Sequence, residues 1–165
     1  MQHGEDWDMT RKIDLAEAPT LFGTRYPAPH DEPCQARRRW RLGDAAGLTQ
    51  FGINLLRLPA GQWSSQRHWH SAEDEFVYVL EGEVVLVSDD GEEALRAGEC
   101  AGFKAGEPNG HHLQNRSGAE AVILEIGARN PEHDAVHYPD IDLAMRAGSR
   151  EFLHRDGTPY RRPPA

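Results

Sequence analysis

The stretch RHWHSAEDEFVYVLEG, residues 67–82, places two histidines separated by one residue before a polar turn and a continuous apolar segment. The segment EFVYVL has the length and the aromatic and β-branched content of a buried strand. Side chains alternate across a strand, so His68 and His70 are expected to point to one face and Trp69 to the other. This spacing permits both imidazoles to bind one ion, and Glu75 can fold back and offer a carboxylate to the same point.

Short apolar runs continue on both sides of this stretch and alternate with turn signals. The runs are RRRWRL (37–42), LTQFGINLLRL (48–58), EFVYVL (75–80), EVVLV (83–87), ECAGF (99–103), HHLQN (111–115) and AEAVILEI (119–126). Seven or more short strands at such spacing are typical of an antiparallel sandwich or barrel. The dipeptides Glu81-Gly82 and Asp90-Gly91 supply bends between neighbouring strands. We therefore predict an all-β chain.

The chain has the length of a single domain, because 165 residues fall within the roughly 100 to 200 that one core organises. Residues 1–36 lack periodicity, and their YPAPHDEPC segment predicts an extended N-terminal arm packed on the barrel. Residues 37–129 are expected to form the barrel. Residues 130–165 then form a C-terminal tail, in which DIDLAMRAG (140–148) permits one short helix that ends at Gly148.

The charge of the chain limits its partners. A formal charge of -9, from 27 acidic and 18 basic residues, repels phosphate backbones and anionic membranes. The arginines of RRRWR (37–41) are accordingly expected to pair with the protein's own acids rather than with nucleic acid. No apolar run approaches the roughly 20 residues of a membrane span, and the acidic N-terminal segment does not resemble a secretory signal. We predict a cytoplasmic protein without a nucleic-acid or membrane partner.

Several strands, FVYVL among them, are apolar on both faces. A second sheet can cover one face, and the arm, the tail or another subunit must cover the other. This pattern predicts a homodimer.

A third histidine is available in GHHLQN. If this segment is a strand, parity puts His111 on one face with Leu113 and Asn115, and His112 on the other face with Gln114. Parity alone leaves both histidines as candidates.

The sequence resembles that of a cupin, a family with two conserved motifs. The first, G(X)5HXH(X)3-4E(X)6G, is matched with one extra residue before the first histidine by Gly61, His68, His70, Glu75 and Gly82. The second, G(X)5PXG(X)2H(X)3N, is matched with a lysine in place of proline and a longer loop by Gly98, Lys104, Gly106, His111 and Asn115. His111 keeps the three-residue interval to Asn115, which favours it over His112.

The resemblance implies a small antiparallel jelly-roll β-barrel that holds one divalent transition metal per chain. The implied metal ligands are His68, His70, Glu75 and His111. Three imidazoles and one carboxylate suit Fe, Mn, Ni, Zn or Cu, and they leave one or two positions open to water or substrate. The adjacent acids Glu73 and Asp74 are expected to be solvated at the turn. The tail resembles that of small bacterial single-domain cupins, which largely lack an assigned reaction.

The open coordination position favours a metal-dependent enzyme acting on a small oxygen-bearing metabolite. Isomerase or epimerase, lyase and dioxygenase reactions all remain candidates, and no catalytic residue is identified from the sequence. The alternative is a cupin that binds a small molecule as a sensor or carrier without turning it over. A purely structural metal is disfavoured, because structural sites close their coordination sphere and prefer cysteine.

Overall fold

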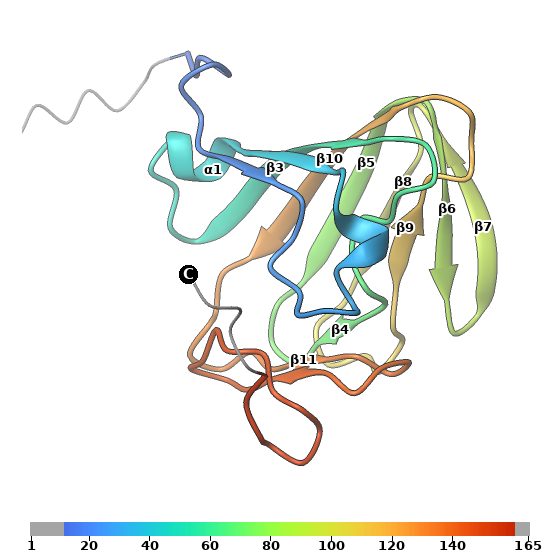
Figure 1. Cartoon of the computed structure of the whole chain (residues 1–165). Coiled ribbons are helices and arrows are strands. Elements are labelled where there is room, and N and C mark those ends of the chain that lie inside the picture. The colour runs from blue at the N-terminus through green and yellow to red at the C-terminus, as the bar shows by residue number, and fades with distance from the viewer. Residues whose placement is uncertain (1–11, 161–165) are drawn as a thin grey trace, which may run out of the picture.

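The computed structural model describes residues 12–160, so the first eleven residues of the predicted arm and the last five of the tail lie outside the described residues. Twelve strands and two short helical turns follow one another (Figure 1). The strands are β1 (Thr20–Phe22), β2 (Arg38–Arg41), β3 (Phe51–Leu58), β4 (Trp69–His70), β5 (Glu75–Glu81), β6 (Glu83–Ser88), β7 (Gly91–Arg96), β8 (Cys100–Phe103), β9 (His112–Gln114), β10 (Ala121–Ala128), β11 (Val136–His137) and β12 (Ala144–Met145). The helical turns are a 3-10 turn at Glu32–Cys34 and α1 at Leu42–Ala45. The predicted all-β class is confirmed.

Three antiparallel sheets make up the barrel. The largest has the order β1-β2-β3-β10-β5-β8, and the two smaller sheets have the orders β7-β6-β9 and β12-β11-β4. Among residues 12–160, no helix has the length and apolar character needed to cross a membrane.

The main core fills the space between the largest sheet and the β7-β6-β9 sheet. Alternate residues of β5 divide between the two faces, with Val77 and Val79 buried and Phe76 and Tyr78 exposed. This is the period of two expected for a strand with one face on the core. The buried core cluster comprises Leu56, Leu58, Val77, Val79, Val84, Leu95, Leu113, Ala121 and Ile123.

Gly82 is the point at which the chain leaves the large sheet for the smaller one. It joins β5 to β6 with a φ of 80°, a conformation that L side chains rarely adopt. A Cβ at this position would lie 3.0 Å from the Cα of Ala121. The bend predicted at Glu81-Gly82 therefore depends on glycine for both its conformation and its space.

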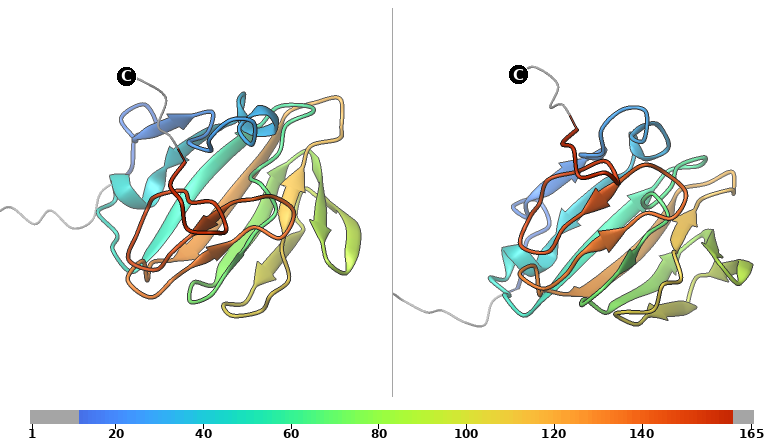
Figure 2. Two further views of the ribbon diagram at one scale, coloured as in Figure 1. Left: turned by 60° about the horizontal axis from the view of Figure 1, so that its bottom comes forward. Right: turned by 90° about the horizontal axis from the view of Figure 1, so that it is seen from below.

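The arm and the tail both add strands to the barrel. Strand β1 of the arm pairs with β2 and extends the large sheet. Strand β11 of the tail pairs with β4 and β12, so the tail lies across the end of the barrel that contains the HWH segment. Figure 2 shows this orange and red segment crossing the strands.

The short helix permitted by DIDLAMRAG does not form, and this interpretation was wrong. Ala144 and Met145 form β12 instead, and Gly148 ends a turn with a φ of 72°. The backbone of Ala144 exchanges hydrogen bonds with Leu153, and Leu143 is buried against Val136. Extended pairing within the tail thus satisfies backbone groups that a helix would have paired locally.

Candidate metal centre

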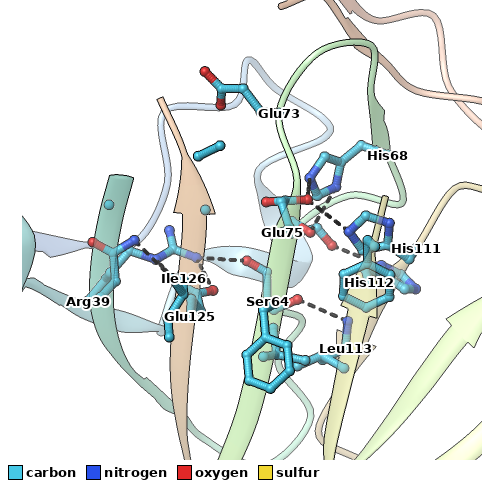
Figure 3. A pocket seen from close by; sticks show the side chains of 18 of the residues that line it. Arg39, Ser64, His68, Glu73, Glu75, His111, His112, Leu113, Glu125 and Ile126 are labelled. Carbon is cyan, nitrogen blue, oxygen red and sulfur yellow. Dashed lines mark hydrogen bonds and ion pairs between the residues drawn. The ribbon is translucent and has the colours of Figure 1, made fainter. Parts of the chain in front are cut away.

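Three imidazoles converge on one carboxylate oxygen near the end of the barrel. The Nε2 atoms of His111, His68 and His70 lie 2.9, 3.4 and 3.5 Å from Oε2 of Glu75. The ligand atoms of His68, His70 and Glu75 all lie within 4.8 Å of one another, and His111 joins them through its contact with Glu75. Figure 3 shows the side chain of Glu75 facing those of His68 and His111. The four residues that the sequence indicated are therefore neighbours in space.

Local backbone pairing brings these side chains together. His68 and His111 exchange backbone hydrogen bonds of 3.1 and 2.9 Å, which joins the two motif segments directly. His70 is the second residue of β4, and Glu75 is the first residue of β5. Trp69 points away from the cluster and stacks on His137 with ring centroids 4.1 Å apart. The predicted alternation of the HWH segment is present.

His112 makes contacts different from those of His111. Its Nδ1 lies 2.9 Å from the backbone oxygen of Ser65, and its Nε2 lies 3.0 Å from the side-chain nitrogen of Gln114. Burial lowers the pKa of His112 to about 4, so this imidazole is neutral at neutral pH. Both ring nitrogens of His112 thus have hydrogen-bond partners outside the cluster, whereas Nε2 of His111 faces Glu75.

The other ring nitrogens of His68 and His70 have partners that orient them. Nδ1 of His68 lies 2.9 Å from the backbone oxygen of Gln66. Nδ1 of His70 lies 2.6 Å from Oδ2 of Asp134, whose Oδ1 accepts a hydrogen bond from the backbone of Ala72. Such partners hold the proton on Nδ1 and direct the lone pair of Nε2 toward a metal.

The electrostatics of the cluster favour an ionised carboxylate. Burial alone would raise the pKa of Glu75, but the surrounding imidazoles hold it well below its usual value. Burial likewise opposes the charge of His70, yet the hydrogen bond to Asp134 and the charges of Glu75, Asp134 and Glu73 together outweigh burial and raise the pKa of His70. A carboxylate with three oriented imidazoles is a donor set that fits a divalent transition metal.

His111 is held by packing rather than by a second hydrogen bond. Its ring stacks on Phe103 with centroids 3.5 Å apart, and its Nδ1 is buried without a hydrogen-bond partner among the described residues.

The cluster lies between two cavities. One cavity of about 370 Å³ extends from His68 and His111 to Arg39 and Glu125, and Figure 3 shows these two pairs on opposite sides of it. A second cavity of about 320 Å³ shares Glu75 and His111 with the first. A small molecule in either space would therefore reach the cluster.

Glu73 differs from the sequence-based expectation, whereas its neighbour Asp74 is exposed as expected. Glu73 is half-buried, lines both cavities and accepts a 2.6 Å hydrogen bond from the backbone of Asn130. Burial raises the pKa of Glu73. The solvated turn predicted for this residue was wrong, because the tail segment after Gly127 folds back over it.

Two arginines of the RRRWR run pair with acids of the same chain, as predicted. Arg39 donates two hydrogen bonds to Glu125, of 2.6 and 2.7 Å, inside the larger cavity. Arg41 lies 2.7 Å from Asp44. Each of these two guanidinium groups therefore has a carboxylate partner.

Sequence reasoning missed Asp134 and Tyr138. Tyr138 is buried and its ring lies 5.9 Å from that of His68. Both residues come from the tail, whose sequence carries no periodic signal that would place it beside the HWH segment. Only the pairing of β11 with β4 brings them there.

Comparisons with known proteins bear on the family and the fold of this chain. The model of the Cupin domain family matches residues 54–127. A sugar phosphate isomerase of the cupin superfamily from Silicibacter pomeroyi is 43% identical, with a TM-score of 0.84 over 92% of this chain and 97% of that chain. A putative sugar phosphate isomerase from Acidithiobacillus ferrooxidans is 30% identical, with a TM-score of 0.66 over 78% of this chain and 82% of that chain.

A more distant structure shares the fold alone. The polyketide cyclase RemF from Streptomyces resistomycificus is 19% identical, with a TM-score of 0.63 over 81% of this chain and 87% of that chain. No functionally curated protein matches the sequence.

Proposed function

Because this chain belongs to the cupin superfamily, we propose that it is a metal-dependent isomerase acting on a small phosphorylated sugar. The observation that carries the proposal is the convergence of three imidazoles and a carboxylate beside a cavity of about 370 Å³. That volume lies within the range of about 300 to 1,000 Å³ typical of small-molecule sites. The name of the 43% identical Silicibacter pomeroyi protein, a sugar phosphate isomerase, supports this choice among the reactions that the sequence leaves open.

We assign the metal to His68, His70, Glu75 and His111, with Fe, Mn, Ni, Zn and Cu as the candidate ions. When bound, the ion supplies a Lewis acid that polarises a carbonyl or hydroxyl oxygen of the sugar. The oriented imidazoles keep their Nε2 atoms directed at Glu75, and Phe103 packs against the ring of His111. These contacts preorganise the site before substrate arrives.

Isomerisation also needs a group that moves a proton between neighbouring carbons. Of the three carboxylates lining the larger cavity, Glu75 belongs to the proposed ligand set and Glu125 is paired with Arg39. Glu73 remains, and we assign it this role. It would take the proton from the hydroxyl-bearing carbon beside the carbonyl and return it to the carbonyl carbon, while the hydroxyl proton moves to the former carbonyl oxygen, so that no oxidant or reductant is consumed.

We also propose that the protein is a homodimer. Phe76, Tyr78 and Leu80 alternate along β5 on the face opposite the core, and each is more than a third exposed. An apolar face of this kind is typical of an interface between subunits. The cytoplasmic location stays a prediction.

The test of the proposed function begins with elemental analysis of the purified protein and its His111→Ala and His112→Ala variants. Near-stoichiometric metal is expected in the wild type and in His112→Ala, and a strong loss is expected in His111→Ala. Circular dichroism checks that each variant is folded.

Turnover is then measured on a panel of pentose and hexose phosphates, with aldose and ketose forms separated by chromatography. Glu73→Gln is expected to keep its metal and to lose about 100-fold or more of the wild-type rate. Asp74→Asn, its exposed neighbour, is the matched control. A metal-loaded protein that binds sugar phosphates but leaves them unchanged would refute the isomerase and favour a sensor or carrier.

A further inference from the structure

Arg37 is a buried cation that forms no salt bridge with an acid among residues 12–160. Its exposed fraction is 4%, and it lies on the wall of the larger cavity. Its Nε donates a 3.1 Å hydrogen bond to the backbone oxygen of Gly23, while its Nη1 has no partner among the described residues.

Arg37 directly precedes β2 and continues the alternation of that strand. Arg37, Arg39 and Arg41 all line the cavity, because alternate residues of a strand share a face. Arg38 lies on the other face, where its guanidinium carbon is 4.5 Å from the ring centre of Trp40. The sequence RRRWR thus sends three of its guanidinium groups toward the cavity.

Arg37, Arg39 and Arg41 differ in their counter-charges. Arg39 holds both carboxylate oxygens of Glu125, and Arg41 is paired with Asp44. Burial and the neighbouring charge of Arg39 lower the pKa of Arg37, but an arginine remains charged at neutral pH. A buried charge without an acidic partner is costly, and none of the described residues supplies one to Arg37, so this site is suited to an anion supplied from outside.

Aromatic contacts connect Arg37 to the metal cluster. Its guanidinium carbon lies 5.9 Å from the ring centre of Tyr26. Tyr26 packs edge-to-face on Tyr138 at 5.8 Å, and Tyr138 stacks on His68 at 5.9 Å. Arg37 and His68 border the same cavity and are linked through the half-buried Tyr26 and the buried Tyr138.

We propose that Arg37 binds the phosphate group of the substrate while the sugar end faces the metal cluster. The choice of phosphate rests on the proposed function; the presence of an anion subsite rests on Arg37 itself. The planar guanidinium matches phosphate oxygens through two parallel N–H bonds, which a lysine ammonium cannot reproduce.

The test is isothermal titration of the full-length, metal-loaded protein with inorganic phosphate. Arg37→Met is expected to raise the Kd for phosphate by about tenfold or more. Arg38→Met, the matched control on the outer face of β2, is expected to keep the wild-type Kd. Wild-type protein stripped of its metal with a chelator is also expected to keep it, which separates phosphate at Arg37 from phosphate on the metal. Acetate is titrated in parallel, and equally tight acetate binding would reassign the subsite to carboxylates.

A thermal unfolding measurement separates binding from a structural role. Because Arg37 has no acidic partner in the described part of the chain, Arg37→Met is expected to leave Tm unchanged or to raise it. If that variant fails to fold, Arg37→Lys keeps the charge without the planar geometry and is expected to weaken phosphate binding.

Two results would overturn the proposal: a wild type that binds no phosphate up to about 10 mM, or an Arg37→Met variant with unchanged affinity and lowered Tm. The two proposals can also fail separately. If Arg37→Met loses phosphate binding but the wild type turns over no sugar phosphate, the isomerase is removed and the subsite is kept. Turnover of a sugar phosphate, with a phosphate affinity that Arg37→Met leaves unchanged, would keep the isomerase and remove the subsite.

Discussion

At the scale of single residues, His70 takes its orientation from a carboxylate 64 positions further along the chain. Asp134 is itself fixed, because its second oxygen accepts the backbone N–H of Ala72. A partner of this kind sets the tautomer of the imidazole and raises the basicity of the nitrogen that faces the metal. The proposed ligand set therefore depends on a residue outside both motifs.

Asp134→Ala is expected to weaken metal binding by about 10- to 100-fold, because His70 loses the acceptor that holds its Nδ1 proton. Competition against a chromogenic chelator measures the affinity. Asp156→Ala removes an exposed aspartate from the same tail and is expected to bind metal like the wild type. If Asp134→Ala bound metal equally well, Asp134 would serve only to attach the tail.

At the scale of elements, the pairing of β3 with β10 forms the centre of the large sheet. Leu56 lies directly opposite Ile123 in this pairing, and neither side chain is exposed to solvent. Because the core is close-packed, neighbouring side chains fill only part of a space left by a truncated leucine. The stability of the sheet that carries Glu75 therefore depends on these interior positions.

Leu56→Ala is expected to lower the free energy of unfolding by about 2 to 5 kcal/mol, through lost burial and a residual cavity. Urea denaturation measures the change. Phe22→Ala truncates a side chain that is 70% exposed and is expected to change stability by less than about 0.5 kcal/mol. Equal effects of the two variants would contradict the assignment of the core to this face.

At the scale of the whole molecule, the outer face of the large sheet is apolar across five strands. Residues directly opposite each other in the antiparallel pairings form one row across β2, β3, β10, β5 and β8, consisting of Trp40, Leu55, Leu124, Tyr78 and Cys100. Neither the described part of the arm nor that of the tail buries Tyr78 or Leu80, which are 37% and 43% exposed. The proposed second subunit would cover this row.

Leu80→Glu is expected to convert a dimer into a monomer, because it places a charge in the proposed apolar interface. Sedimentation velocity measures the mass. Arg150→Glu changes the charge of an exposed tail residue and is the control. A monomeric wild type would remove the homodimer from the proposal, whereas a dimer in Leu80→Glu would move the interface to another face.

The local part of this architecture was open to prediction. The apolar runs around FVYVL and VILEI lie in β5 and β10, and the bends at Glu81-Gly82 and Asp90-Gly91 join the strands expected on either side. Alternation and turn chemistry act over a few residues, so the sequence displays them directly. The tail from 130 onward was harder to read, because its short strands gain stability from pairing with β4 and with each other rather than from their own pattern.

By itself the sequence determined the all-β class, the family resemblance and the parity that puts His68 and His70 on one face, since each depends on spacing along the chain. The tertiary structure decided that Glu73 lines a cavity, that Asp134 holds His70, and that Arg37 is buried with no acidic partner between residues 12 and 160. These are properties of segments that meet only after folding: the tail reaches the HWH segment through β11, and Glu125 of β10 takes Arg39 rather than Arg37 as its partner. Charge neutralisation and burial depend on three-dimensional neighbours, and no local pattern specifies them.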